Sequence, residues 1–182
     1  SSDDTADIAR REGARVVHEG RPGYGAAVDA GVRSATAEYV AVMDADGSMD
    51  PAALTPMVAD VRCGDVTLAV GRRRPVSAGV WPWHARAGNS AAVCWLRRRT
   101  GLKVHDIAPV RVCRTADLLA LDVQDRRFGY PVELLIRAAA AGWSIREYDV
   151  AYRPRAAGTR SKVSGSAIGT LRAARDFARA LS

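Results

Sequence analysis

Short apolar runs alternate with amphipathic or alanine-rich segments along most of this chain. The run at residues 39–43 contains β-branched residues and ends abruptly at a carboxylate, which is typical of a buried strand. Similar runs predict strands at residues 14–18, 65–70 and 144–152, and another just after Pro109. Helical periodicity, capping residues and glycine stops predict helices near residues 4–13, 26–35, 51–61, 90–99, 130–142 and 166–181. The alternation predicts an α/β domain with a mostly parallel sheet flanked by helices.

Two carboxylates, Asp44 and Asp46, directly follow the strand at residues 39–43. Asp50-Pro51 then reads as an N-cap and a first-turn proline. The acids therefore lie beyond the carboxyl end of a strand, where open α/β sheets bind ligands. Mg²⁺ and Mn²⁺ take oxygen ligands, commonly one or two carboxylates together with substrate phosphates. The spacing predicts a metal–diphosphate site, although it also fits a loop that only caps a helix.

Composition and charge restrict the class of protein. The 182 residues suit one domain, and 48% of them are hydrophobic, which is enough for a core. No apolar run reaches the ~18 residues of a membrane span. The three cysteines are far apart, so we expect buried, reduced thiols in a cytosolic protein rather than zinc or disulfides. The net charge of +7 permits binding to nucleic acid, an anionic membrane or phosphorylated substrates.

Several basic positions are candidates for binding phosphate. Arg72 follows the strand at residues 65–70 and is placed to meet phosphate or the acids of the first strand end, whereas Arg73 and Arg74 are expected in a solvated turn. A basic, glycine-containing segment around Lys162 predicts a phosphate-gripping loop. The turn at residues 21–25 allows close backbone approach to a ligand, or it is a plain loop before a helix.

Two further patterns have a structural and a functional interpretation. Glu133 and Arg137 are four residues apart in a predicted helix, which predicts an intrahelical ion pair. Trp81, Trp83 and Trp95 lie close to arginines at positions 86 and 97–99. This cluster suits a membrane headgroup region or a nucleic-acid face, but core tryptophans beside a solvated basic helix end give the same pattern.

The ordered set of motifs resembles the family 2 glycosyltransferases of the GT-A fold, and within them the dolichyl-phosphate mannose synthase-like, polyprenyl-phosphate branch. The matching segments span nearly the whole chain: Ser1–Thr5, Gly23-x-Gly25-x-Ala27 with Gly31, Asp44-Ala-Asp46-Gly-Ser48-x-Asp50-Pro51, Asn89, Asp106-x-x-Pro109-x-Arg111, Glu133, Val150-x-Tyr152 and Ser161-Lys162. The resemblance implies a Rossmann-like sheet and inverting, metal-dependent transfer of a sugar from a GDP- or UDP-sugar to a polyprenyl phosphate.

The resemblance also implies roles for individual residues. Asp44 and Asp46 would hold Mg²⁺ or Mn²⁺ and the donor diphosphate. Further cations would bind the donor or acceptor phosphates, namely Arg72, Arg153 or Arg155, and Lys162. Asp106 and Arg111 would be the catalytic residues, with Arg111 on a phosphate. Because a phosphate acceptor is already anionic, such a site needs positioning and cationic clamping rather than a strong base.

The family's first strand has no counterpart before Ser1, so residues 1–182 are expected to form a single catalytic domain that is incomplete at its N-terminus. We expect a cytoplasmic enzyme that contacts the inner face of the membrane through the Trp81/Trp83/arginine cluster and has no nucleic-acid partner. Two alternatives stay open: a sugar-phosphate nucleotidyltransferase, and a non-catalytic basic module that binds membrane or nucleic acid.

Overall fold

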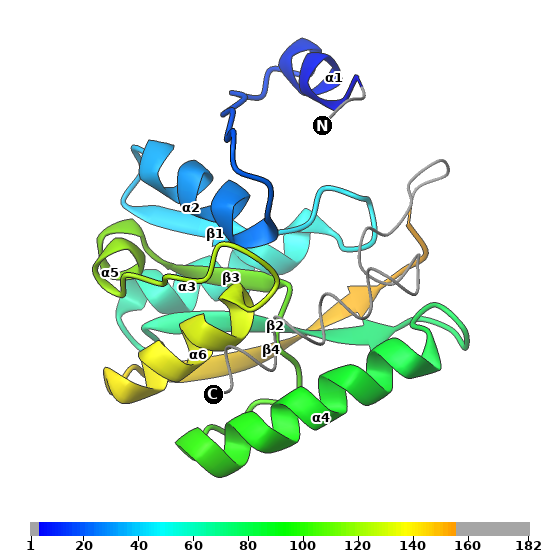
Figure 1. The fold of residues 1–182 in the computed structure, drawn as a ribbon, viewed down its shortest axis with the longest axis vertical. Coiled ribbons are helices and arrows are strands. Elements are labelled where there is room, and N and C mark those ends of the chain that lie inside the picture. The colour runs from blue at the N-terminus through cyan, green and yellow to red at the C-terminus, as the bar shows by residue number, and fades with distance from the viewer. Residues whose placement is uncertain (1–3, 156–182) are drawn as a thin grey trace.

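The structure is a computed structural model, which describes residues 4–155 (Figure 1). Its strands are β1 (Tyr39–Val42), β2 (Leu68–Pro75), β3 (Val110–Arg114) and β4 (Ile145–Tyr152). Its helices are α1 (Thr5–Arg11), α2 (Tyr24–Ser34), α3 (Leu54–Cys63), α4 (Trp83–Thr100), α5 (Thr115–Ala120) and α6 (Tyr130–Ala140), with a 3₁₀ turn, η1 (Pro51–Ala53), before α3. The predicted α/β class is confirmed.

The four strands form one mixed sheet in the order β1-β3-β2-β4. β2 and β4 are parallel, whereas β3 is antiparallel to both of its neighbours. The prediction of a mostly parallel sheet is therefore wrong for two of the three pairings in the described part. Residues 101–109 carry the chain from the end of α4 back to the carboxyl end of β2, so β3 enters the sheet from that end.

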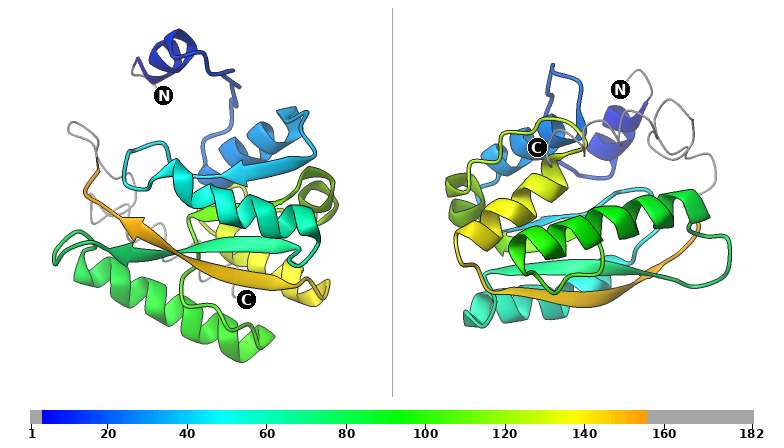
Figure 2. Two further views of the ribbon diagram at one scale, coloured as in Figure 1. Left: turned by 180° about the vertical axis from the view of Figure 1, so that it is seen from behind. Right: turned by 60° about the horizontal axis from the view of Figure 1, so that its bottom comes forward.

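Helices cover both faces of the sheet (Figure 2). On one face α4 and α6 pack over Leu68 and Val70 of β2, and on the other α3 packs over Ala69 and Val150. This alternation along β2 is what the two-residue period of a strand requires when both faces are buried.

Several local expectations were wrong. Residues 14–18 form no strand, α4 begins at Trp83 rather than at residue 90, and α5 was not predicted. β2 continues through its three arginines to Pro75, because β4 supplies backbone partners as far as Tyr152. Of the three cysteines, only Cys113 is buried, and Cys63 and Cys94 are exposed. The predicted helix at residues 166–181 lies outside the described residues.

The glycines at the start of α2 allow another segment of the protein's own backbone to approach closely. A Cβ added at Gly25 would lie 2.3 Å from the carbonyl oxygen of Asp125, because the Gly25 amide donates to the Arg127 carbonyl across the same contact. Glu133 holds the facing loop by accepting hydrogen bonds from the Gln124 and Asp125 amides. The expected Glu133–Arg137 ion pair is present at 2.6 Å.

We expect Gly25→Ala to lower the free energy of unfolding by about 1–3 kcal/mol, because the new methyl group would overlap backbone atoms that cannot rotate away. Gly31→Ala is the matched control in the same helix. It has no atom within 4 Å of the added Cβ and should stabilise the protein by up to about 1 kcal/mol. Urea denaturation of both variants measures the difference, and equal effects would show that the contact at residue 25 is not tight.

Candidate active site

The two carboxylates predicted from the sequence lie in the loop that follows β1. The Asp46 carboxylate accepts a hydrogen bond from the Ser48 amide at 3.0 Å and another from the Arg155 guanidinium. Beyond it, Asp50 Oδ1 accepts from the Ala52 amide at 2.9 Å, which confirms the predicted cap.

The end of β4 holds this acidic loop in place. The Arg153 amide donates to the Ser48 carbonyl at 2.8 Å, and its guanidinium lies 3.7 Å from Asp50. Arg155, two residues further on, forms an ion pair with Asp46. The fold thus brings two arginines that are about a hundred residues away in sequence into contact with the acidic loop after β1.

The two acids experience opposite electrostatic environments. Burial and the neighbouring Asp46 charge raise the pKa of Asp44, and the charges of Arg111, Arg155 and Arg73 offset this only in part. Burial also acts to raise the pKa of Asp46, but hydrogen bonds from Ser48 and Arg155 outweigh it and hold that pKa below its usual value. Asp44 is therefore the acid whose negative charge the protein leaves under-compensated.

The donor set at this loop fits a hard divalent cation. Asp44 and Asp46 offer carboxylate oxygens, and their mutual repulsion is what a cation between them would relieve. Within residues 4–155 no third histidine, cysteine or acid joins them to complete a metal cluster. That number of protein ligands suits Mg²⁺ or Mn²⁺, which fill their remaining positions with water and substrate phosphate.

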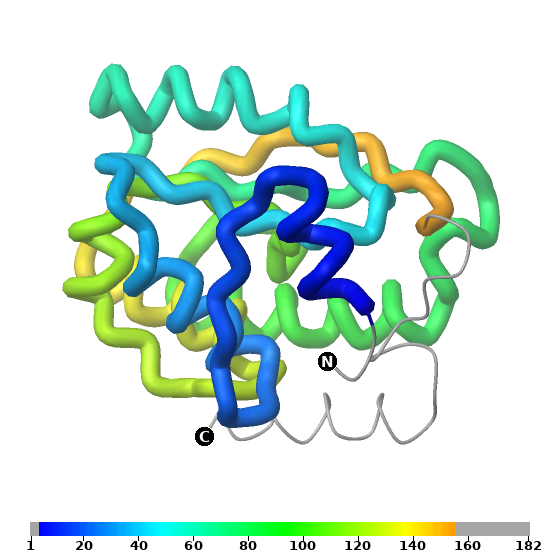
Figure 3. Tube along the Cα trace, turned by 90° about the horizontal axis from the view of Figure 1, so that it is seen from above, coloured from blue at the N-terminus to red at the C-terminus, as the bar shows by residue number. Residues whose placement is uncertain are grey.

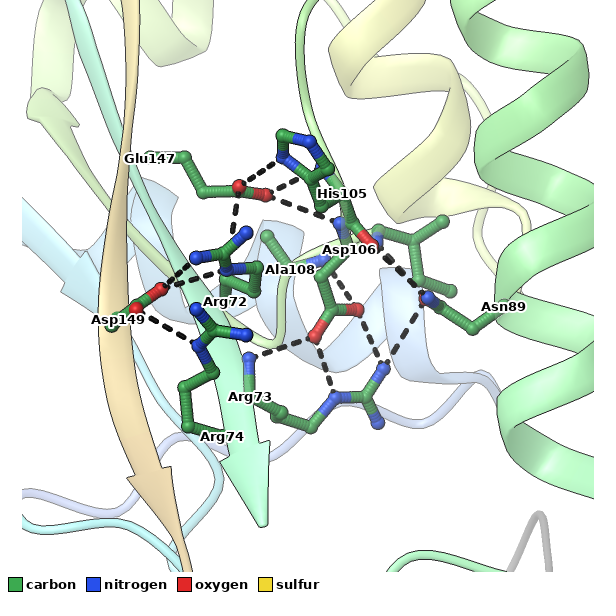
Figure 4. Close-up of polar contacts among 10 residues, drawn as sticks. Arg72, Arg73, Arg74, Asn89, His105, Asp106, Ala108, Glu147 and Asp149 are labelled. Carbon is green, nitrogen blue, oxygen red and sulfur yellow. Dashed lines mark hydrogen bonds and ion pairs between the residues drawn. The ribbon is translucent and has the colours of Figure 1, made fainter. Parts of the chain in front are cut away.

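Asp106 is fully buried and binds Arg73 (Figure 4). Its carboxylate accepts from Arg73 Nη2 at 2.7 Å, from Nε at 2.9 Å and from the Arg73 amide at 2.9 Å. It also accepts from the Ala108 amide at 3.3 Å. β3 begins only at Val110, opposite Gly71, so the aspartate supplies the acceptor that a longer strand would have offered to β2.

Arg73 is not the solvated turn residue that the sequence suggested. Its guanidinium lies 4.0 Å from the centroid of the Trp81 ring, and Nη2 is 3.4 Å from the side-chain oxygen of Asn89. Because β2 extends past its apolar run, its side chains continue to alternate between the two faces, and Arg73, the middle arginine, turns inward. Sequence reasoning missed this residue, although the side-chain alternation of a continued strand could have found it.

Arg72 and Arg74 turn to the other side of β2. Arg72 forms an ion pair with Asp149 at 2.6 Å and lies 3.6 Å from Glu147, while Arg74 is 2.8 Å from Asp149. Arg72 therefore contacts acids of β4 rather than those after the first strand, and its predicted contact with phosphate stays a prediction. Glu147 in turn accepts from the amide of His105 and lies 2.8 Å from its ring nitrogen Nδ1.

Arg111 is buried in β3, where it lies opposite Val42 at the end of β1. Its Nη1 donates to the Tyr24 hydroxyl at 3.1 Å and its Nη2 to the Ile107 carbonyl at 3.3 Å, whereas Nε has no hydrogen-bond partner in the described part of the chain. Tyr24, between the two turn glycines, was not singled out from the sequence. Lys162, the last predicted phosphate ligand, lies outside the described residues.

Two adjoining clefts lie beside these groups. One has a volume of about 630 Å³ and is lined by Arg72, Arg73, Arg74, Pro75, Ser77, Ala78, Trp81, Arg86, Asn89, Ser90, His105 and Asp106. The other, of about 450 Å³, shares Ser77 and Ala78 with the first and is also lined by residues 79–80 and 152–155. Arginines dominate the charged lining of both, which suits anionic ligands such as phosphates.

The fold is a mixed sheet flanked by helices, with an acid pair after one strand and arginine-lined clefts nearby. Such a site is suited to substrates that carry a diphosphate. Residues 1–118 match glycosyl transferase family 2, and the chain belongs to that family. The family identifies a glycosyltransferase rather than a nucleotidyltransferase. Within residues 4–155 no helix has the length and apolar character that a membrane crossing requires.

Several known proteins resemble this chain along most of its length. A protein described as an uncharacterized glycosyltransferase of Mycobacterium tuberculosis is 56% identical over 182 residues, covering 100% of this chain and 83% of that protein. A dolichyl-phosphate hexose transferase of Haloferax volcanii is 33% identical over 171 residues, 93% of this chain and 75% of that protein. An undecaprenyl-phosphate mannosyltransferase of Micrococcus luteus is 32% identical over 133 residues, 70% and 54% of the two chains.

The fold is also found among solved structures. Glucosyl-3-phosphoglycerate synthase from Mycobacterium tuberculosis, solved with phosphoglyceric acid, has a TM-score of 0.72 and 22% sequence identity to this chain. The similarity covers 100% of this chain and 64% of the synthase. At this identity the comparison establishes a shared GT-A fold.

Proposed function

We propose that this protein transfers a sugar, with inversion, from a nucleotide-diphosphate sugar to a polyprenyl phosphate, with a divalent cation bound at Asp44 and Asp46. The observation that carries the proposal is the Asp44–Asp46 pair, in which the charge of Asp44 is under-compensated, next to clefts lined by arginines. One part of the site would bind a cation and the diphosphate, and the other would bind the phosphate of the acceptor.

The donor side is assigned to the acidic loop and the end of β4. Asp44 and Asp46 would hold Mg²⁺ or Mn²⁺, which when bound neutralises the diphosphate leaving group. Arg155 already contacts Asp46, and Arg153 contacts the same loop, so both could turn to donor phosphates. The synthase that shares the fold has been solved with Mn²⁺ and UDP, which supports a UDP-sugar as the first donor to test.

The acceptor side is assigned to the larger cleft. Two relatives are named for dolichyl-phosphate and undecaprenyl-phosphate chemistry, while the synthase that shares the fold is solved with phosphoglyceric acid. A phosphate monoester is common to these acceptors. Arg73 and Arg86 line the cleft and would bind that group, with Asp106 fixing the orientation of the Arg73 guanidinium.

The proposed reaction does not need a strong general base. An acceptor phosphate oxygen, ionised at neutral pH, forms the new bond to the anomeric carbon from the face opposite the diphosphate. The bond from that carbon to the diphosphate oxygen breaks, and its electron pair leaves with the nucleotide. Arginines placed on both phosphates lower the barrier by positioning and by stabilising charge. This accounts for a buried Asp106 whose two oxygens are already occupied by protein donors.

We expect UDP-glucose or GDP-mannose to bind the protein in the presence of Mn²⁺ and to bind at least tenfold more weakly after chelation. Isothermal titration calorimetry with each nucleotide sugar, with Mn²⁺ and with chelator, identifies the preferred base and sugar. Asp46→Asn should remove the effect of Mn²⁺, because one carboxylate of the pair is lost. Arg62→Ala, an exposed substitution on α3, is the control and should bind as the unaltered protein does.

Nucleotide-sugar binding that is unaffected by chelation would contradict the metal site, and the absence of binding with either nucleotide would contradict the proposed donor class. Transfer assays then decide the acceptor. A short polyprenyl phosphate should accept the sugar, and transfer to phosphoglycerate alone would overturn the lipid-phosphate assignment.

A further inference from the structure

The positive charge of this protein is concentrated in one continuous segment. Residues 66–105 contain no aspartate or glutamate, and they contain eight cations: Arg72, Arg73, Arg74, Arg86, Arg97, Arg98, Arg99 and Lys103. These exceed the net charge of +7 for the whole chain, so the rest of the protein is close to neutral. The segment comprises β2, α4 and the connection between them, and α4 carries exposed arginines and no acid.

The connection from β2 to α4 has a different character. Residues 75–83, Pro-Val-Ser-Ala-Gly-Val-Trp-Pro-Trp, carry no charge, and Ser77 has the only hydroxyl group among them. Val76 is 53% exposed and Trp83 is 79% exposed. This uncharged tip projects from the end of the molecule, beyond the end of β2 (Figure 3).

The three tryptophans of this region have separate roles. Trp81 is half-buried beneath Arg73 and edge-on to Tyr152, and Trp95 packs against the core. Trp83 instead contacts only the adjacent His84 ring among the aromatic side chains of the described residues. The sequence cluster therefore divides into two structural indoles and one that faces solvent.

Cations flank the uncharged tip on both sides. Arg74 precedes it and is exposed, and Arg86, in the first turn of α4, forms no ion pair with any residue of the described range. The first helical turn adds a partial positive charge through its free amides. An apolar tip between cations is complementary to a bilayer surface, where anionic headgroups lie above hydrocarbon.

We propose that residues 75–83 form a membrane-docking tip, in which Val76 and Trp83 enter the headgroup region of an anionic bilayer while Arg74 and Arg86 contact lipid phosphates. An exposed valine favours this partner over nucleic acid, because bases stack on aromatic rings but gain little from an aliphatic side chain. A tryptophan at the boundary of headgroups and hydrocarbon is a common anchor.

The tip also borders the proposed acceptor cleft, and this consequence rests on the function proposed above. Pro75, Ser77, Ala78 and Trp81 line the cleft, whereas Val76 and Trp83 do not. Docking through these two side chains would therefore bring the cleft to the membrane surface. A lipid-borne phosphate could then reach Arg73 without its chain leaving the bilayer.

The test is sedimentation of the purified protein with vesicles of phosphatidylcholine, with and without about 30% phosphatidylglycerol, in the absence of any donor. We expect binding only to the anionic vesicles, weakening steeply as salt rises. Trp83→Ser should weaken binding about tenfold, because it removes a large apolar side chain from the contact. Val17→Ser, which alters another exposed apolar residue, should have no effect.

Equal binding of Trp83→Ser and the unaltered protein, or no binding to anionic vesicles, would overturn the docking tip. Binding to a single-stranded oligonucleotide but not to vesicles would overturn it in favour of nucleic acid. Asp46→Asn separates this proposal from the enzymatic one, since it should abolish metal-dependent donor binding and leave vesicle binding intact. Transfer to a short, water-soluble polyprenyl phosphate should be unchanged by Trp83→Ser.

Discussion

Asp44→Asn is expected to reduce sugar transfer by about a hundredfold or more and, in the absence of metal, to make the protein more stable at neutral pH. The activity is lost because an amide is a weaker ligand for Mg²⁺ or Mn²⁺ than a carboxylate. The stability is gained because the pKa of Asp44 is raised in the folded protein, first by burial and then by the charge of Asp46. Its ionised form therefore opposes folding.

Asp46→Asn is the matched comparison, and its effect on stability should have the opposite sign. Its pKa is lowered in the folded protein because hydrogen bonds from Ser48 and Arg155 outweigh burial. The ionised group therefore stabilises the fold above its unfolded pKa, and this contribution is lost as the pH falls through the folded value. The substitution should thus lower transfer and stability together.

The pH dependence follows from the same signs. For Asp44 the destabilisation is complete above its raised folded pKa and disappears as the pH falls towards the unfolded value of 3.8. The advantage of Asp44→Asn should therefore vanish in acid. Calorimetric melting in chelator across this range, together with initial transfer rates in Mn²⁺, measures both effects. Full transfer activity in Asp44→Asn would refute the metal–carboxylate assignment.

Asp106→Ala is expected to lower the free energy of unfolding by about 3–5 kcal/mol, because it leaves the Arg73 charge poorly compensated in a largely buried setting. The side chain of Asp106 is 1% exposed and that of Arg73 is 18% exposed. For a chain of this length the loss corresponds to roughly 6–20 °C in melting temperature.

The control for this change is Asp149→Ala on β4, which breaks the more exposed ion pairs to Arg72 and Arg74 of β2. Exposed pairs contribute about 0–1 kcal/mol, so the two alanine variants should differ clearly in thermal melts. Similar losses would mean that burial does not strengthen the Arg73–Asp106 pair. The double variant Arg73→Met with Asp106→Leu should recover part of the stability but none of the transfer activity, because the proposed phosphate ligand is gone.

The catalytic role predicted for Asp106 can be tested through the conservative variant. Asp106→Asn keeps one side-chain oxygen, which can still accept two hydrogen bonds. It should therefore preserve the fold better than Asp106→Ala. If Asp106 acts by orienting Arg73, transfer by Asp106→Asn should fall mainly through a higher KM for the phosphate acceptor. A fall in kcat alone, with KM unchanged, would instead indicate direct participation in the chemical step.

The amino-acid sequence by itself determined several local features of the fold and the position of the acids after the first strand. The apolar run of β1, the Asp50–Pro51 cap and the Glu133–Arg137 pair depend on neighbours within a few residues, so their patterns were sufficient. The order of motifs along the chain was sufficient to indicate the family, because a family resemblance depends on residue types and their spacing.

Only the tertiary structure decided which charges meet. β3 runs antiparallel to its neighbours because of the path of residues 101–109, and Arg73 turns inward because pairing with β4 extends β2. Arg155 reaches Asp46 and Asp106 reaches Arg73 across long sequence separations. Burial likewise distinguishes Trp83 from Trp81 and Trp95. These long-range partners and the exposure of each tryptophan are properties of the packed chain, and local patterns of residue types do not encode them.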